Sequence, residues 1–252
     1  MSFEQAIESG GLRLAAHFAR PPRASLGPMP TLVLAHGFPL ENGGAAAWDG
    51  THPELADRLA RDTGWAVLTF NFRGTGESTG SFSLAGWLDD LAAVCERLHS
   101  DPQVGGVWLA GAGLGGSLSI CRAAEDLSVR GVATLAAPAD AGPWADDPAA
   151  LLARARELGA VRDPAFPPDF DVWATELAQV QPVSAAAKLP PRPLLVLHGS
   201  DDDVVPLTDA RVLADAGGES AELRIVTGAG HRLRHDPRAV ALLMGWMERQ
   251  QV

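Results

Sequence analysis

The chain contains 252 residues, of which 46% are hydrophobic and 20% are charged. This composition is typical of a soluble globular protein, with a length that suits one large α/β domain or two small ones, and it excludes disordered, fibrous and disulfide-stapled proteins. Acidic residues outnumber Lys and Arg by 31 to 20, which gives a formal net charge of −11. A charge of this sign disfavours nucleic acid and anionic membranes as partners.

The two cysteines, Cys95 and Cys121, lie far apart in apolar segments, without a Cys-x-x-Cys spacing. They predict reduced core thiols in a cytoplasmic protein, with no metal cluster. The N-terminal segment lacks the basic and apolar stretches of an export signal, and no run of about 18 apolar residues occurs. We therefore expect a cytoplasmic protein that does not span a membrane.

The chain begins with a predicted hairpin, since residues 3–7 and 12–19 flank a Ser-Gly-Gly turn and resemble two antiparallel edge strands. Short apolar runs then predict strands at 31–36, 65–71, 104–110, 130–136, 193–198 and 221–226. Helix-periodic segments between them predict helices at 53–61, 83–98, 114–124, 207–216 and 237–249. This alternation, with strands that are apolar on both faces, predicts a parallel sheet covered by helices on both sides.

The segment 138–190 interrupts the alternation. It is too long for a loop in a compact domain and contains the helix-like stretches LLARARELG and VWATELAQV, so we expect a helical cap over the carboxyl edge of the sheet. Its aromatic residues either line an apolar pocket or form the core of the cap: Trp144, Phe166, Phe170 and Trp173. No linker is visible, so residues 1–252 are expected to form one domain that contains this insertion.

Glycine-rich and polar motifs follow five of the predicted parallel strands, at the edge where open α/β sheets bind ligands. In chain order they read HGF (36–38), NFRGTGES (71–78), GAGLGG (111–116), HGSDDDVVP (198–206) and GAGH (228–231). This ordered set resembles the α/β-hydrolase family over essentially the whole chain, especially its single-domain esterases, lipases and serine-aminopeptidase-like members. The resemblance implies an α/β-hydrolase fold with a mostly parallel sheet of about eight strands, and it implies no cofactor or metal.

In that family a strand, a sharp turn and a helix form the nucleophile elbow, Gly-x-Ser-x-Gly. Carried over by position, the resemblance places Gly113 where the serine nucleophile stands, between the small residues Gly111 and Gly115. It also implies that the backbone N–H groups of Phe38 and Leu114 form the oxyanion hole.

The resemblance further implies Asp202 as the acid and His231 as the histidine of the triad. A run of three aspartates is most often a solvated turn, and Asp202 is favoured by its offset from the preceding glycine and by the Val-Val-Pro that follows. Asp201 and Asp203 remain alternatives for the acid, and His235 is a less favoured alternative for the histidine.

Glycine at position 113 removes the atom that attacks the substrate and becomes acylated. A His-Asp pair with oxyanion donors still gives a residual catalysis of roughly 10³ to 10⁴-fold over water. Glycine also adopts without penalty the strained elbow backbone that costs other residues about 1 to 3 kcal/mol. Substitute nucleophiles are disfavoured by their expected positions, namely Ser78, Ser117, Ser119 and Cys121.

Residues 111–116 also fit the dinucleotide-binding pattern Gly-x-Gly-x-x-Gly. That reading requires an acidic residue about 20 positions further on, and residues 131–136 contain none. We therefore disfavour a dinucleotide cofactor.

Three functional hypotheses remain. The first is a protein of carboxylester-hydrolase lineage without acyl-enzyme chemistry, acting as a ligand-binding pseudoenzyme or as a non-covalent His-Asp catalyst. The second is an active serine esterase or acyl hydrolase in which residue 113 was changed from serine to glycine. The third is a binding module without pocket chemistry. The first two predict a small acyl ester or a related apolar ligand as the partner, and the sequence leaves the oligomeric state open.

Overall fold

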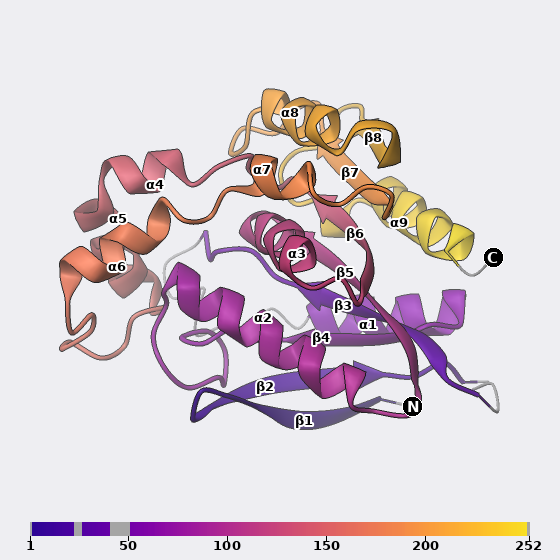
Figure 1. Cartoon of the computed structure of the whole chain (residues 1–252), viewed down its shortest axis with the longest axis horizontal. Helices are drawn as coiled ribbons and strands as arrows, with labels where there is room; N and C mark the ends of the chain where they lie inside the picture. The colour runs from indigo at the N-terminus through magenta and orange to yellow at the C-terminus, as the bar shows by residue number, and fades with distance from the viewer. Residues whose placement is uncertain (1, 23–26, 41–50, 251–252) are drawn as a thin grey trace.

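An eight-stranded sheet runs through the computed structural model of the protein, which describes residues 2–22, 27–40 and 51–250. Its strands are β1 (Ser2–Ser9), β2 (Leu12–Ala19), β3 (Met29–Ala35), β4 (Ala66–Phe70), β5 (Val104–Ala112), β6 (Val129–Leu135), β7 (Leu194–Gly199) and β8 (Ala221–Val226). Their spatial order is β1-β2-β4-β3-β5-β6-β7-β8, and every pair from β4 onward is parallel (Figure 1). The mostly parallel sheet predicted from the sequence is confirmed.

The N-terminal hairpin adds the two antiparallel strands of this sheet. Gly10 and Gly11 form its turn with positive φ angles of 54° and 81°. The expectation of two edge strands is wrong for β2, because residues 16–19 pair with β4 while the other side of β2 pairs with β1. Of the two hairpin strands, only β1 lies at an edge of the sheet, and Leu14 and Phe18 of β2 are buried.

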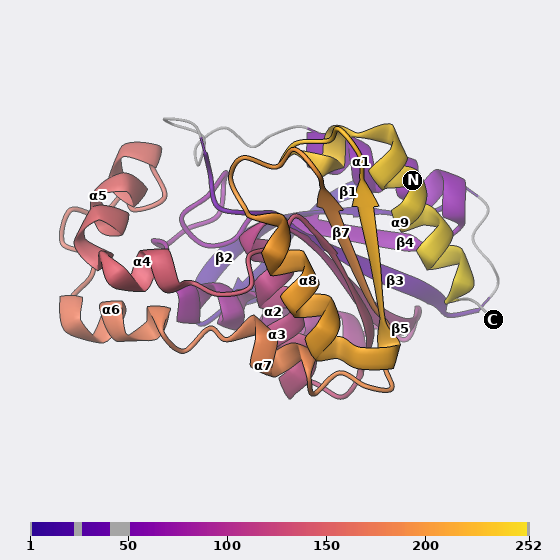
Figure 2. The same cartoon turned by 90° about the horizontal axis from the view of Figure 1, so that it is seen from above.

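Helices cover both faces of the sheet (Figure 2). One face carries α2 (Leu84–His99), α3 (Leu114–Glu125) and α8 (Leu207–Gly217), and the other carries α1 (Thr51–Thr63) and α9 (Pro237–Arg249). Along β3 the side chains alternate between the two cores, with Val33 facing the first group of helices and Leu32 the second. Burial on both faces accounts for the uninterrupted apolar runs of the central strands.

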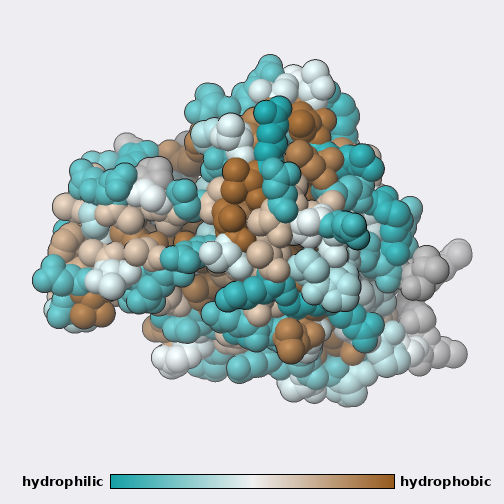
Figure 3. All heavy atoms as spheres, turned by 45° about the horizontal axis from the view of Figure 1, so that its top comes forward, coloured by the Kyte–Doolittle hydropathy of each residue, from teal (hydrophilic) through white to brown (hydrophobic). Residues whose placement is uncertain are grey.

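The insertion between β6 and β7 contains α4 (Gly142–Asp146), α5 (Pro148–Leu158), α6 (Phe170–Leu177) and α7 (Pro182–Ala186). The helices α4 to α6 form a lobe beside the sheet, at the left of Figure 1, and Figure 3 shows this lobe with hydrophilic residues over much of its surface. Trp173 is buried in the main hydrophobic core and donates from Nε1 to Phe82 O at 3.2 Å, so it ties the insertion to the segment before α2. The last helix, α7, packs against α3 and α8.

Cys95 and Cys121 are free, buried thiols, and burial raises the pKa of each to about 12. Within the described ranges, no group of three or more potential metal-binding side chains occurs. None of the described helices combines the length and apolarity needed to cross a bilayer.

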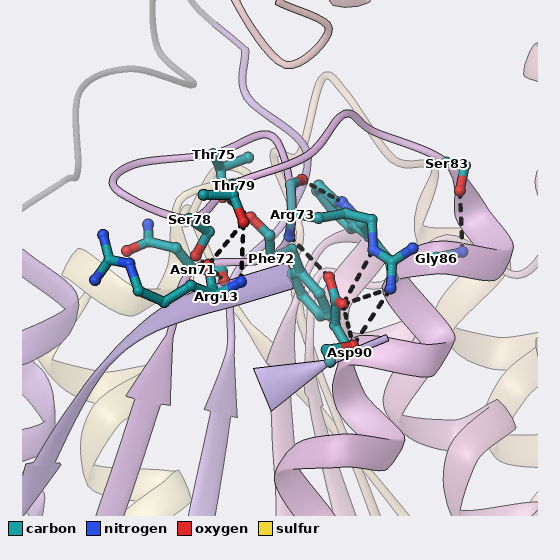
Figure 4. Close-up of polar contacts among 12 residues, drawn as sticks. Arg13, Asn71, Phe72, Arg73, Thr75, Ser78, Thr79, Ser83, Gly86 and Asp90 are labelled. Carbon is teal, nitrogen blue, oxygen red and sulfur yellow. Dashed lines mark hydrogen bonds and ion pairs between the residues drawn. The ribbon is translucent and has the colours of Figure 1, made fainter. Parts of the chain in front are cut away.

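A buried ion pair fixes the loop that follows β4. The side chain of Asp90 on α2 is fully buried and accepts hydrogen bonds from Arg73 N (2.8 Å), Arg73 Nε (3.0 Å), Arg73 Nη2 (2.7 Å) and Ser9 Oγ (2.7 Å) (Figure 4). The Trp87 ring adds a bond from Nε1 to Arg73 O at 3.1 Å. Both carboxylate oxygens are therefore satisfied, which is the condition under which a buried charge is tolerated.

We expect Asp90→Ala to lower the free energy of unfolding by about 3 to 5 kcal/mol, because it leaves the largely buried guanidinium of Arg73 without its counter-charge. Asp62→Ala serves as the control, since Asp62 pairs with the exposed Arg61 on α1 and its loss should cost less than about 1 kcal/mol. Urea unfolding of both variants measures the difference, and equal losses would show that the buried pair contributes no more than a surface pair.

Candidate active site

The turn from β5 into α3 brings the backbone of residue 113 to the carboxyl edge of the sheet. Gly113 has φ 51° and ψ −128°, a conformation that side chains rarely adopt. Its N–H donates to Leu135 O at 2.8 Å, and its carbonyl accepts from Gly116 N at 2.9 Å. A Cβ atom built on Gly113 lies 3.6 Å from His231 Nε2 and has no closer neighbour. The turn therefore has the strand-turn-helix geometry of a nucleophile elbow, with its central side-chain position directed at a histidine.

The glycines on either side of this turn allow backbone segments to touch. A Cβ atom on Gly111 would lie 2.2 Å from Gly115 O, and one on Gly115 would lie 2.3 Å from His36 O. Both distances are far below any tolerated contact, and both involve backbone atoms that cannot turn away. Only glycine fits at these two positions.

His231 and Asp202 meet beside the elbow. His231 Nδ1 lies 3.0 Å from Asp202 Oδ2, and because a carboxylate only accepts, the proton sits on Nδ1. The other carboxylate oxygen, Oδ1, accepts from the backbone N–H groups of Val204 and Val205, each at 2.9 Å. The alternative acids, Asp201 and Asp203, are exposed and do not form this contact.

A second histidine lies against the same carboxylate. His198 is fully buried, and its Nε2 lies 2.9 Å from Val205 O and 3.4 Å from Asp202 Oδ2. Both neighbours are acceptors, so Nε2 carries a proton and holds the turn that presents Asp202 to His231. The sequence places His198 four residues before Asp202 but offers no signal that their side chains meet.

The two expected oxyanion donors lie at the same edge. Leu114 is the first residue of α3, so its N–H has no partner within the helix. His36 Nδ1 donates to Gly37 O at 2.7 Å, because its Nε2 accepts from Phe72 N at 3.1 Å. In a trans peptide, the Phe38 N–H points in the direction opposite to the Gly37 carbonyl. The hydrogen bond from His36 to that carbonyl therefore also fixes the direction of the Phe38 N–H.

These groups surround a cavity of about 510 Å³. Phe38 and Trp144 form an aromatic wall, with ring centroids 5.0 Å apart, and Asn71 and Thr75 lie on the wall formed by the loop after β4. Gly113 and His231 also line this cavity. Trp144 therefore contributes to the pocket, whereas Trp173 is buried in the main hydrophobic core.

The substitute nucleophiles are occupied elsewhere. Ser78 Oγ donates to Asn71 O at 2.6 Å and accepts from Ala15 N at 2.9 Å. Ser117 Oγ donates to Pro138 O at 2.6 Å, and Ser119 Oγ donates to Gly115 O at 2.7 Å. Each of these hydroxyls stabilises a backbone turn or helix and faces a carbonyl instead of a histidine.

We expect Gly113→Ala to lower the free energy of unfolding by about 1 to 3 kcal/mol, since the methyl group fits and only the positive φ is strained. Gly115→Ala should cost more than about 4 kcal/mol or prevent folding, because its methyl group would overlap the backbone of β3. Urea unfolding and circular dichroism measure both variants. A larger loss for Gly113→Ala than for Gly115→Ala would contradict the close backbone packing of the elbow.

A pH dependence follows from His36. The pKa of His36 is lowered from 6.5 to about 4, chiefly because the imidazolium would lose its surrounding water, and the nearby charge of Arg234 acts in the same direction. The unfolded chain therefore takes up a proton at this position between pH 6.5 and 4 while the folded protein does not, so stability falls as pH falls through this window.

We expect His36→Gln to have a shallower loss of stability over that window, with the difference in slope approaching at most about 1.4 kcal/mol per pH unit. Urea unfolding of both proteins across that pH window measures the two slopes. Parallel curves would show that His36 titrates alike in the folded and unfolded states.

Comparison with known proteins identifies the family to which the chain belongs. A model of the alpha/beta hydrolase family matches residues 32–242. No curated protein matches the chain in sequence. Among solved structures, the chain is similar to the alpha/beta hydrolase GrgF from Penicillium sp. sh18, with a TM-score of 0.76, 18% identity and coverage of 99% of this chain and 98% of that one.

Two esterase structures show the same fold. Est1E from Butyrivibrio proteoclasticus has a TM-score of 0.72 and 17% identity, with 98% of this chain and 97% of that chain covered. The esterase domain of a Rhodothermus marinus protein has a TM-score of 0.71 and 22% identity, with 99% and 97% covered. The family match over most of the chain, together with the eight-stranded sheet and its elbow, shows that this chain belongs to the alpha/beta hydrolase family.

Proposed function

We propose that this protein binds a small acyl ester or a related carbonyl compound in the cavity at Gly113 and does not form an acyl-enzyme. The proposal rests on the glycine at the elbow. A Cβ atom at position 113 would lie 3.6 Å from His231 Nε2, but glycine has no side chain to carry a hydroxyl there. Covalent catalysis requires an atom there that can attack and then leave, and glycine supplies none. The sheet, the elbow and the esterase neighbours support the lineage, and the residue at position 113 supports the loss of covalent chemistry.

The remaining groups support slow non-covalent hydrolysis. With its proton on Nδ1 held by Asp202, neutral His231 presents the lone pair of Nε2 to the elbow. In this role Nε2 takes a proton from a water as the water oxygen bonds to the ester carbonyl carbon. The N–H groups of Phe38 and Leu114 stabilise the oxyanion. As the carbonyl re-forms, His231 returns the proton to the departing alkoxide, so the products are an acid and an alcohol.

The intact packing of the elbow favours a second candidate from the same lineage. Gly111 and Gly115 keep the backbone contacts that an elbow needs, although position 113 has no nucleophile to present. An active serine esterase with a serine-to-glycine change at 113 would have this geometry. The natural coding sequence at codon 113 separates the two candidates, because a serine codon there would replace the first candidate with the second.

Gly113→Ser tests whether the hydroxyl is the only missing part. The Cβ position faces His231 Nε2, so we expect the variant to hydrolyse short-chain p-nitrophenyl esters and to react with a fluorophosphonate at the introduced hydroxyl. Its stability should lie about 1 to 3 kcal/mol below that of the parent, because the new side chain must adopt the positive φ of the elbow. The parent should show little or no hydrolysis and no labelling.

Two controls make the result specific. Gly113→Ala carries the backbone strain without the nucleophile and should stay inactive. Adding His231→Ala to Gly113→Ser should remove the gained activity, since the serine then has no base. Stoichiometric labelling of a serine in the parent would refute the proposal. A folded Gly113→Ser that neither hydrolyses esters nor reacts would show that the surrounding groups are not competent, and would favour a binding module.

A further inference from the structure

Asn71, the first residue after β4, lines the cavity and is only 5% exposed. Its backbone N–H donates to Ala15 O at 2.8 Å, and its backbone carbonyl accepts from Ser78 Oγ at 2.6 Å. Within the described part of the chain, the side-chain carboxamide of Asn71 forms no hydrogen bond and no ion pair. The residue is therefore fixed through its backbone, and its carboxamide remains available to a bound molecule.

The loop after β4 leaves room for this carboxamide at Gly76. A Cβ atom added to Gly76 would lie 2.3 Å from Asn71 Nδ2 and 2.7 Å from Asn71 Oδ1, and the φ angle of Gly76 is 48°, which favours glycine. Gly76 lines the same cavity. Figure 4 shows the Asn71 side chain pointing away from the Arg73–Asp90 pair that anchors this loop. The carboxamide is therefore packed against backbone at the cavity wall.

A buried carboxamide without partners costs free energy, because it gives up the hydrogen bonds that it would form with water. Most buried polar groups are satisfied by other atoms of the protein. Thr75, on the same wall, follows this rule, since its hydroxyl donates to Phe72 O at 2.7 Å. Asn71 departs from the rule at a cavity, where a bound molecule can supply the missing hydrogen bonds.

The sheet sets the distance between Asn71 and the elbow. β3 lies between β4 and β5, and Leu34 of β3 is level with both Thr69 and Ala110. Two residues further along, Asn71 is level with Ala112 at a separation of two strand spacings, about 10 Å. A ligand whose carbonyl lies at the elbow therefore reaches Asn71 with a group several bonds further along its chain.

The chemistry of the carboxamide indicates what this group is. A carboxamide presents donors on Nδ2 and an acceptor on Oδ1 side by side. A ligand group that only accepts would leave Oδ1 unpaired, and an apolar chain would leave both atoms unpaired. A neutral group that both donates and accepts suits the site, and a hydroxyl is the smallest group of this kind. Such contacts discriminate well, because an analogue without the group leaves a buried polar atom unsatisfied.

We propose that Asn71 is a specificity-determining residue, whose carboxamide binds a hydroxyl or a similar neutral donor and acceptor group on the chain of an acyl ligand. The inference rests on the proposed function of the cavity and names its ligand class, esters of hydroxyacids being the simplest members. The ester carbonyl lies at the elbow, and the hydroxyl lies at the loop after β4.

Calorimetric titration of the parent protein with methyl 6-hydroxyhexanoate and with methyl hexanoate tests the proposal, since the two probes differ in one hydroxyl. We expect the hydroxy ester to bind about two- to tenfold tighter, the effect of one hydrogen bond. Asn71→Leu should reverse this preference, because the hydroxyl would then be buried without a partner. Asn71→Asp should keep a preference for the hydroxy ester, because a carboxyl group still accepts from the hydroxyl.

Thr75→Val is the matched control, since it removes from the same wall a hydroxyl whose proton is already bonded to Phe72 O, and it should keep the preference. Binding of methyl hexanoate to Asn71→Leu at least as tightly as to the parent shows that the cavity is intact. The assignment of Asn71 is overturned if the parent binds the two esters equally, if the preference survives Asn71→Leu, or if Thr75→Val or Asn71→Asp removes it.

The same titrations separate this inference from the proposed function. Equal binding of the two esters by the parent would overturn the role of Asn71 and leave the proposed function standing, because the cavity would still bind an acyl ester. Binding of neither ester would overturn both.

Discussion

The close approach of α3 to β3 is the contact on which the candidate site depends. The backbone of Gly115 lies so near His36 O that an added Cβ would be only 2.3 Å away. Gly37 lies similarly close to the elbow, since its Cβ would be 2.9 Å from Ala112 O. Without side chains between them, the first turn of the helix lies directly against the residues that follow the strand. Any larger residue would separate the two expected oxyanion donors.

Two further devices hold the walls around this contact. His36 links the end of β3 to the loop after β4 by accepting from Phe72 N, and the Arg73–Asp90 pair anchors that loop to α2. On the other side, the carboxylate of Asp202 is held by backbone N–H groups through one oxygen, which leaves the other oxygen for His231. Both walls are thus held by contacts that do not involve residue 113.

The sequence predicted the central strands and most helices because burial on both faces leaves uninterrupted apolar runs, and glycine and proline mark their ends. It also indicated Asp202 among three adjacent aspartates, through its offset from the strand, and the structure brings this residue to His231. The interior position of β2 was not predicted, because the sequence pattern of a hairpin does not show whether one or both of its strands lie at the edge of a sheet. The contact of His198 with Asp202 was missed because it depends on the path of the turn between them.

The positions of the cavity arginines could not be predicted for the same reason, since they too depend on the path of the backbone. In the sequence, Arg232 and Arg234 read as charged residues ahead of the last helix, and only the 3-10 turn with Leu233 in the core brings both to the cavity. Their neighbour Arg238 has the same charge but pairs with Asp236 outside it. Whether an arginine lines the cavity or caps a helix is therefore decided by the direction of the backbone over a few residues.

Glycine at the elbow allows the backbone conformation of the turn but lacks the hydroxyl that a serine would add. The backbone conformation, with φ 51°, favours glycine, so its presence relieves strain that a nucleophile would impose. The contact between His231 and Asp202 and the first N–H of α3 depend on other residues and do not require that strain. The packing around the turn is therefore separate from the residue that occupies position 113, so the turn keeps its geometry although it presents no side chain to His231.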